Sequence, residues 1–180
     1  MIQILPQVAV DLSEINKNRI FDLMVRAYAI TEEDIWGENY VRVPREEYFR
    51  LLENETFFIA LESDQLIGSI QVYRKSDTLF GLGLLNIDFE HKGRNIGSLL
   101  VSAAEDYARQ NGGKCMQIEI LRPEISDSAY KKWLEEWYEK LNYRFIETVP
   151  FEAIETEQSH KKKKMKTNAV FDIFHKTLSP

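Results

Sequence analysis

The most informative stretch of this sequence is Ile87-Asp88-Phe89-Glu90-His91-Lys92-Gly93-Arg94-Asn95-Ile96-Gly97-Ser98-Leu99-Leu100. The apolar run from Leu82 to Phe89 predicts a buried strand, and apolar side chains at helical spacing follow the stretch. The turn between them holds two glycines and two cations. A strand–turn–helix unit of this kind points free backbone N–H groups and the positive end of the helix dipole at one spot. It therefore predicts a phosphate-binding turn.

Two familiar nucleotide sites do not fit this turn. A Rossmann dinucleotide site needs G-x-G-x-x-G and an acid that closes the next strand, whereas this chain offers only Gly93-x-x-x-Gly97. A phosphate loop for ATP needs Gly-Lys followed by Ser or Thr, which the turn lacks. An ordinary strand–helix turn with a solvated Lys–Arg pair stays open as the simplest alternative.

Composition favours a single folded domain over residues 1–180. The hydrophobic content of 44% and the aromatic content of 12% suffice for one complete core and argue against disorder. No apolar run approaches the ~20 residues of a membrane span, and no basic segment followed by an apolar one begins the chain. We therefore expect a cytoplasmic protein with no membrane partner.

Charge and cysteine content narrow the classes further. The formal net charge of −6 argues against a nucleic-acid partner. Cys115 is the single cysteine, and it has no Cys or His neighbour at metal-ligand spacing, so we expect no metal and a packed thiol. Residues 155–168 hold five lysines, among them Lys161–Lys164. A charged loop is the commoner outcome for such a run than an anion-binding site.

The order of the expected elements predicts an α/β fold. We expect strands over Gln3–Val10, Thr56–Leu61, Leu66–Tyr73, Leu79–Phe89, Cys115–Leu121, Tyr143–Ile154 and Ala169–Phe174. We expect helices after Asp11 or Ser13, from Pro44, after the glycine turn and from Ser126–Ser128 to Leu141, with an irregular segment over Thr31–Val43. A helix between the fourth and fifth strands makes them parallel. The prediction is one mixed sheet of about seven strands with helices on both faces.

The opening stretch resembles the acyl-CoA signature of the GNAT superfamily of N-acyltransferases, V-x-P-x-x-R-G-x-G-I-G. The signature continues with x-x-L-L, and the residues on its expected positions are Ile87, Lys92, Gly93, Ile96, Gly97, Leu99 and Leu100. The departures are Phe89 for proline, Lys92 for arginine or glutamine, and Asn95 for the middle glycine. Asn95 is the mildest departure because asparagine tolerates a positive φ.

A second segment, Trp137-Tyr138-Glu139-Lys140-Leu141-Asn142-Tyr143, resembles the family's A-x-x-L-Y-x-K-x-G-F. Asn142 replaces the glycine that ends the helix, an exchange that a left-handed turn tolerates. The resemblance implies that Tyr138 protonates the thiolate that leaves acetyl-CoA. The same spacing fits the buried face of an amphipathic helix, and the two roles are compatible.

The element order is also that of the GNAT fold, so the resemblance covers almost the whole chain. It implies an N-acetyltransferase that moves an acetyl group from acetyl-CoA directly to a primary amine. It also implies that the fourth strand bulges and diverges from the fifth, so that the pantetheine arm docks like an added strand. The residues that it assigns to the cofactor are Ile87, Phe89, Lys92, Gly93, Arg94, Asn95, Ile96, Gly97, Ser98 and, where relatives often have asparagine, Lys131.

The base that takes the proton of the amine is less defined. Glu119 lies between Ile118 and Ile120 in a strand expected to be central, where burial would raise the pKa of its carboxyl. Asp88 and Glu90 are rivals, and a water chain is a further alternative. A carboxylate paired with Lys or Arg across the strand is an equally open interpretation of Glu119. We expect the catalytic residues to be Tyr138 and Glu119.

The acceptor is expected to be a small cationic amine. An acidic cluster with two aromatic residues lies in the segment that borders the acceptor side in this fold: Glu32, Glu33, Asp34, Trp36, Glu38 and Tyr40. Carboxylates attract an ammonium group, and an aromatic face adds a cation–π energy of roughly 0.5–2 kcal/mol. A solvated acidic loop is the alternative. A non-catalytic acyl-CoA-binding regulatory module also stays open, because the fourth strand lacks the acid that some family members have and Asn95 replaces a glycine of the signature. A homodimer is a further open possibility.

Overall fold

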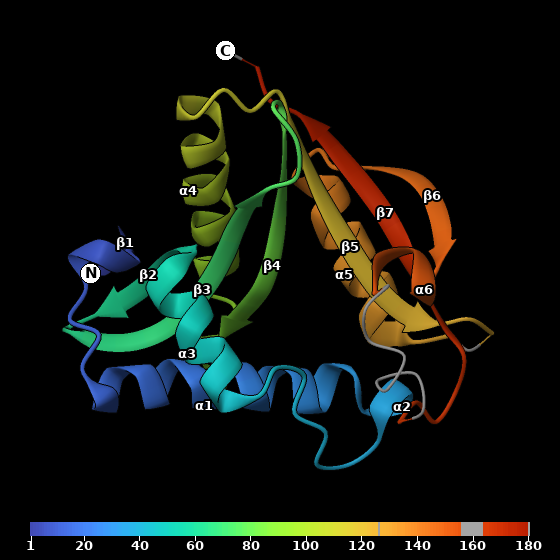
Figure 1. Cartoon of the computed structure of the whole chain (residues 1–180), viewed down its shortest axis with the longest axis horizontal. Helices are drawn as coiled ribbons and strands as arrows, with labels where there is room; N and C mark the ends of the chain where they lie inside the picture. The colour runs from blue at the N-terminus through green and yellow to red at the C-terminus, as the bar shows by residue number, and fades with distance from the viewer. Residues whose placement is uncertain (126, 156–163, 180) are drawn as a thin grey trace.

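The computed structural model describes residues 1–125, 127–155 and 164–179, and these residues form one seven-stranded sheet (Figure 1). The strands lie in the order β1-β2-β3-β4-β5-β7-β6. Their bounds are β1 Ile2–Pro6, β2 Thr56–Glu62, β3 Gln65–Arg74, β4 Leu79–Ile87, β5 Cys115–Pro123, β6 Arg144–Pro150 and β7 Ala169–Thr177. Neighbours are antiparallel except β4 and β5, which are parallel because a helix crosses between them. The predicted mixed sheet is confirmed.

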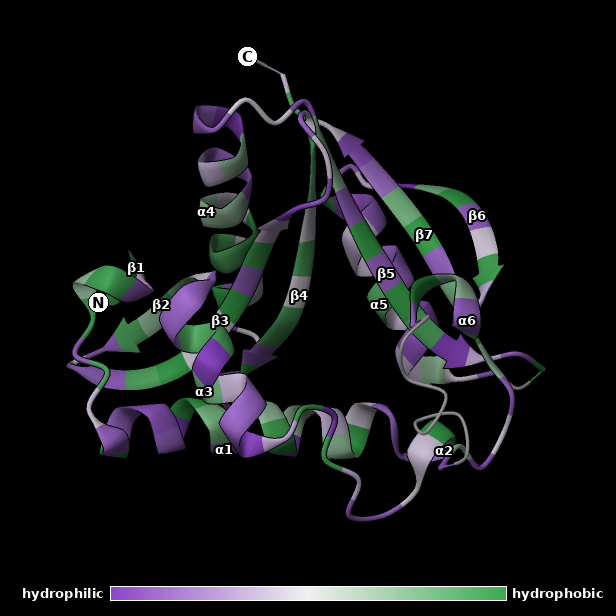
Figure 2. Ribbon diagram, in the orientation of Figure 1, coloured by the Kyte–Doolittle hydropathy of each residue, from purple (hydrophilic) through white to green (hydrophobic). Residues whose placement is uncertain are grey.

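Helices cover both faces of this sheet. Their bounds are α1 Glu14–Thr31, α2 Glu33–Trp36, α3 Arg45–Asn54, α4 Ile96–Gln110, α5 Ala129–Lys140 and α6 Phe151–Ile154, with 3-10 turns η1 Gln7–Ala9 and η2 Phe89–His91. One core contains Ile20 of α1 and Tyr48 of α3, and the opposite core contains Leu100 of α4 and Tyr138 of α5. Figure 2 shows hydrophobic colour along the middle strands, whereas α1 and α4 alternate between hydrophobic and hydrophilic residues.

Three predicted strands are too long. β4 ends at Ile87, before the turn η2, so the predicted end at Phe89 is wrong, and proline ends the other two. β1 ends at Pro6, so the predicted end at Val10 is wrong, and β6 ends at Pro150, so the predicted end at Ile154 is wrong. Proline has no N–H for the ladder, and its fixed φ suits the start of a helical turn. The turn η1 follows Pro6 and the short helix α6 follows Pro150.

The helix starts follow local capping chemistry. The Ser13 hydroxyl accepts a hydrogen bond from the Asn16 N–H at 3.4 Å and begins α1, as predicted. The Ser128 hydroxyl does the same for the Lys131 N–H at 3.4 Å and begins α5. The predicted start at Ser126 lies outside the described residues. The irregular segment before Pro44 contains the single-turn helix α2.

Candidate active site

β4 and β5 pair only at their N-terminal ends. Leu79–Gly81 are in register with Cys115–Gln117, and the two strands then diverge (Figure 1). The diverging parts, Leu82–Ile87 and Ile118–Leu121, line a pocket of about 930 Å³. Because the edges that face each other there have no ladder partner, an extended ligand with amide groups can dock as an added strand. The predicted divergence is confirmed.

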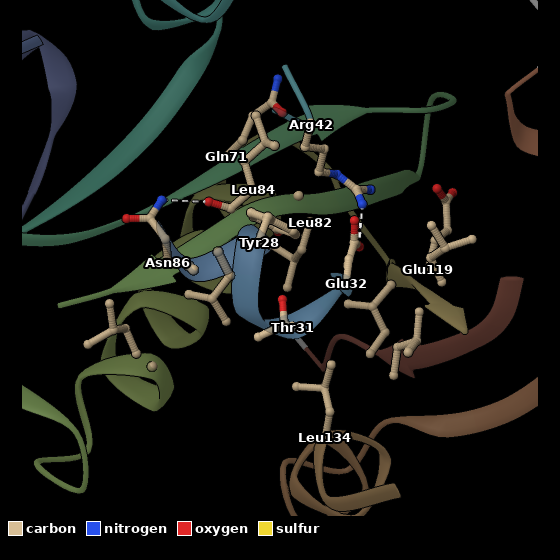
Figure 3. Close-up of a pocket in the computed structure, with 18 of the residues that line it drawn as sticks. Tyr28, Thr31, Glu32, Arg42, Gln71, Leu82, Leu84, Asn86, Glu119 and Leu134 are labelled. Atoms are coloured by element: carbon tan, nitrogen blue, oxygen red, sulfur yellow. Dashed lines mark hydrogen bonds and ion pairs between the residues drawn. The ribbon is translucent and has the colours of Figure 1, made fainter. Parts of the chain in front are cut away.

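β4 also carries the predicted bulge. Ser69 of β3 is opposite Asn86, whereas Gln71 is opposite Gly83, so β4 has one residue more than β3 in this interval. Within it, Leu84 adopts a φ of 51°. The Asn86 side chain holds this conformation, because its Nδ2 donates to the Leu84 carbonyl at 2.9 Å (Figure 3). The same Nδ2 also donates to Ser69 Oγ at 2.8 Å. Asn86 thereby stabilises the wall of the pocket that β4 forms.

The turn after η2 has the geometry of an anion cradle. Gly93 and Asn95 have left-handed φ values of 78° and 62°, and a Cβ at Gly93 would meet nothing within 4 Å. The Asn95 side chain makes no capping hydrogen bond to α4, so the first N–H groups of that helix are available to a ligand. Together with the helix dipole they favour a phosphate at this end of the pocket.

The predicted cofactor residues, except Arg94, line this one pocket. The Arg94 guanidinium instead donates to both carboxylate oxygens of Glu62 at 2.6 Å, which turns its side chain away from the pocket. The Lys92 ammonium lies 3.9 Å from the centroid of the Phe89 ring. His91, whose Nδ1 is buried without a hydrogen-bond partner among the described residues, also lines the pocket.

Aromatic side chains of α5 form the opposite wall of the cradle. Trp133 and Trp137 stack with ring centroids 6.4 Å apart, and both line the pocket. A Cβ at Gly97 would lie 3.1 Å from the Trp137 ring. The glycine at this position therefore permits close packing of α5 on the start of α4, a reason that the motif alone does not reveal.

Tyr138 lies on the same wall and is 7% exposed. Its ring packs against Trp137 and Tyr143, with centroids 4.7 and 5.5 Å away, which fits the core role. Its hydroxyl makes no hydrogen bond to any described residue. Burial raises the pKa of the Tyr138 phenol well above its usual value, and Tyr28 and Tyr130 raise it further. The phenol therefore stays protonated at neutral pH and is available as a proton donor.

Of the three carboxylates considered as the base, only Glu119 lines the pocket. Its Oε1 accepts hydrogen bonds from Lys75 Nζ and, at 2.7 Å, from Gln117 Nε2, which is the paired arrangement left open by the sequence. Asp88 is bound by Arg19 outside the pocket, and Glu90 is exposed. The two rivals are thus not placed to act on a ligand in this pocket.

Three charged residues, Glu32, Arg42 and Lys131, line the pocket together as one cluster where α1 ends and α5 begins. Glu32 is buried, and it accepts hydrogen bonds from Arg42 Nη1 and, at 2.9 Å, from Trp36 Nε1 (Figure 3). Lys131 Nζ lies 4.0 Å from Glu32 Oε1. Burial lowers the pKa of the Lys131 ammonium, and Arg42 lowers it further, whereas Glu32 raises it. Arg42 also lies over the ring of Tyr28, 4.8 Å from its centroid.

The rest of the acidic segment lies elsewhere. Glu33, Asp34 and Glu38 are exposed and do not line the pocket. Trp36 and Tyr40 stack on each other with centroids 4.4 Å apart and are likewise outside the lining. The basis of the prediction of a cationic acceptor therefore reduces to Glu32, whose charge is already matched by Arg42.

Sequence reasoning missed Arg42 and Asn86 as pocket residues. Arg42 stands in a segment without periodicity, and Asn86 is a polar residue in an apolar strand, which was the one available signal.

Within the described residues, no group of three or more His, Cys, Asp or Glu side chains is arranged to hold a metal ion. No helix in that part of the chain is long and apolar enough to cross a membrane. Lys161–Lys163 lie outside the described residues.

Comparison with known proteins bears on the family. The profile of the acetyltransferase (GNAT) family matches residues 18–143. An aminoglycoside 6'-N-acetyltransferase complexed with coenzyme A shares the fold with a TM-score of 0.70 at 19% identity, covering 100% of this chain and 98% of that one. The aminoglycoside 6'-N-acetyltransferase from Enterococcus faecium gives 0.67 at 18%, with 100% and 98% covered.

A GNAT family acetyltransferase from Elizabethkingia anophelis with acetyl-CoA bound gives a TM-score of 0.65 at 13% identity, with 98% of each chain covered. At these identities the likeness is one of fold. No curated protein sequence matches the chain.

Proposed function

The chain belongs to the acetyltransferase (GNAT) family, whose reaction uses acetyl-CoA, and we propose that its pocket transfers the acetyl group directly to a primary amine of small-molecule size. One observation carries this proposal. The gap between β4 and β5 and the uncapped start of α4 open into the same pocket. A phosphate-bearing ligand with a long amide-containing arm fits this combination, because the phosphates meet helix N–H groups and the amides meet free strand edges.

In this proposal the backbone from Lys92 to Ser98 binds the pyrophosphate of CoA. Gly93 supports the assignment, because its φ of 78° and the open space at its Cβ position let the backbone approach a ligand. The pantetheine arm then runs along β4, where backbone groups near Ile87 and Phe89 are its partners. Both residues line the pocket.

The chemical step needs a donor for the developing oxyanion. Leu84 and Leu85 lie in the bulge, so they have no partner in the β3 ladder, and β5 has already diverged there. We assign the oxyanion contact to a backbone N–H of this bulge, because a fixed dipole stabilises the negative charge that the tetrahedral intermediate places on oxygen.

Direct transfer then requires two proton movements. The amine nitrogen forms a bond to the thioester carbon, the carbon–sulfur bond breaks, and Tyr138 gives its proton to the departing sulfur. Glu119 accepts the proton of the amine, directly or through water, since it is the predicted carboxylate that lines the pocket. Cys115 is not part of the lining and pairs in the closed part of the β4–β5 ladder, which is consistent with transfer without an acyl-cysteine.

The alternative from the sequence is a non-catalytic module that binds acyl-CoA and regulates a partner. The Tyr138 phenol favours the enzyme, because a protonated hydroxyl without a hydrogen-bond partner in the described structure stands in the pocket. The experiment is calorimetric titration with acetyl-CoA followed by thiol release across a panel of primary amines. Binding with amine-dependent thiol release supports the enzyme, binding without release supports the module, and absence of binding contradicts both.

A further inference from the structure

Lys131, which the family resemblance assigns to the cofactor, is a buried cation of the pocket with no part in the chemical step proposed above. It lies in the first turn of α5 and is 4% exposed. Its Nζ makes no hydrogen bond to any described residue, and the nearest carboxylate oxygen is Glu32 Oε1 at 4.0 Å. Its Nζ also lies 6.0 Å from the centroid of the Tyr130 ring. A buried ammonium group with only these distant contacts is costly, so a charged ligand group is one way to complete this site.

Two of the carboxylates that line the pocket are bound by cations other than Lys131. Glu32 binds Arg42 and the Trp36 ring N–H, and Glu119 binds Lys75. Glu155, at the end of α6, also lines the pocket and acts electrostatically on Arg42. Lys131 and Arg42 therefore share Glu32, and Asp34 acts electrostatically on Lys131. Within the described residues, Arg42 has a hydrogen-bonded carboxylate and Lys131 has none.

We propose that Lys131 and Arg42 bind a carboxylate of the acceptor, so that the substrate class is amines that also carry a carboxylate. This inference rests on the proposed function and specifies its acceptor. Burial lowers the pKa of Lys131 in the pocket as it stands, and an anion beside it would restore the charged form. The Arg42 guanidinium has donors besides the Nη1 that binds Glu32, and a planar fork suits a carboxylate.

The position of the cluster fits a substrate that extends from the site of transfer. Lys131 and Tyr138 are seven residues apart on α5, which puts their backbones about 10 Å apart on the same helix face. The pocket wall between them includes Leu134, and Tyr28 of α1 lines the pocket as well. An acceptor with an amine near Tyr138 and a carboxylate near Lys131 thus spans an apolar and aromatic stretch.

The cluster also disfavours the cationic acceptor expected from the sequence. A second ammonium group, placed where the acceptor carboxylate is proposed to bind, would lie beside the Lys131 ammonium, although Glu32, Glu47, Glu119 and Glu155 also line the pocket. Like charges at short range in a partly dry pocket repel strongly. A polyamine would therefore bind less well than an amino acid of similar length.

The test compares matched pairs of amines that differ only by a carboxylate. The pairs are lysine with cadaverine and 5-aminovalerate with butylamine, assayed by thiol release from acetyl-CoA. We expect wild-type kcat/KM to favour the carboxylate member of at least one pair by tenfold or more. In Lys131→Met this preference should fall by tenfold or more, through the acceptor KM, with the KM for acetyl-CoA unchanged. Lys131→Arg should retain the preference.

Lys132→Met is the matched control, since Lys132 is exposed and pairs with Asp127 at 3.0 Å, away from the pocket lining. It should leave every ratio unchanged. Lys131→Gln replaces Lys131→Met if the latter fails to fold, as judged by thermal melting. Equal rates within all pairs, a preference for the decarboxylated members, or a retained preference in Lys131→Met would overturn the inference while leaving acetyl transfer intact.

A rise in the KM for acetyl-CoA in Lys131→Met, with the preference retained, would also overturn the inference, because Lys131 would then be a cofactor contact. Absence of transfer to every amine would instead count against the proposed function, and the inference would fail with it.

Discussion

Replacing Asn86 separates the shape of the β4 bulge from the stability of the fold. Asn86→Ala removes the two hydrogen bonds that Nδ2 donates at 2.8 and 2.9 Å, and it leaves the Leu84 carbonyl and Ser69 hydroxyl without this donor. Both positions are almost fully buried, with Asn86 2% and Ser69 0% exposed. Each lost partner costs about 1–3 kcal/mol, so we expect the free energy of unfolding to fall by about 2–6 kcal/mol.

Turnover should fall as well, because the bulge loses its support. The φ of 51° at Leu84 costs about 1–2 kcal/mol for a residue other than glycine. If the strand relaxes by that amount, the population with a correctly placed N–H falls about tenfold, and kcat with it. Acetyl-CoA affinity should fall less than kcat, because the Asn86 side chain makes no hydrogen bond to the phosphate cradle. The assay is kcat from thiol release with both substrates saturating, alongside urea unfolding.

Two further variants make this prediction specific. Ser69→Ala removes one acceptor and keeps the bond to Leu84, so it should lower stability and leave kcat near wild type. Leu84→Gly added to Asn86→Ala should recover part of the lost kcat, because glycine adopts a positive φ without strain. If Asn86→Ala turns over at the wild-type rate, or if Ser69→Ala loses as much kcat as Asn86→Ala, then the hydrogen bond from Asn86 to Leu84 does not support catalysis.

Three other predictions test separate parts of the site. Gly97→Val places its side chain against the Trp137 ring, 3.1 Å from the Cβ position. Acetyl-CoA affinity measured by calorimetry should therefore fall by about tenfold or more, about 1.4 kcal/mol. Unchanged affinity in a folded protein would exclude this turn as the phosphate cradle. Glu119→Gln should lower kcat by about 10²-fold if this carboxylate takes the proton of the amine, whereas a small change would assign that step to water. Tyr143→Phe loses the 3.0 Å hydrogen bond to Glu105. The free energy of unfolding measured in urea should fall by about 1–2 kcal/mol while kcat stays normal. A loss of turnover would show that Tyr143 has a role beyond stabilising the fold.

The parts of the site that depend on local chemistry could be predicted from the sequence. Asn95 and Asn142 were expected to replace glycines in left-handed turns, and their φ values of 62° and 70° confirm it. The parallel pairing of β4 with β5 follows from the helix between them, and their divergence was implied by family resemblance. These features each involve residues close together in the chain or a rule of topology.

Features that depend on distant residues could not be predicted. Glu32, Arg42 and Lys131 meet because the end of α1 lies against the start of α5, and no periodicity encodes that contact. Glu32 therefore looked like part of an acidic surface, whereas it is a buried partner of Arg42. The strand ends at Pro6 and Pro150 were missed for a different reason, because apolar residues continue beyond each proline while the ladder does not.

The Tyr138→Phe variant is the most direct test of proton transfer from Tyr138 to the departing sulfur. It removes the proposed proton donor and keeps the ring that packs against Trp137 and Tyr143. We predict that acetyl-CoA affinity and the melting temperature stay near wild type while kcat falls by about 10²-fold or more. Because burial holds the phenol pKa far above neutrality, this difference should persist between about pH 7 and about pH 9. A Phe variant that turns over at the wild-type rate on the best acceptor would show that Tyr138 only packs, and would contradict the account.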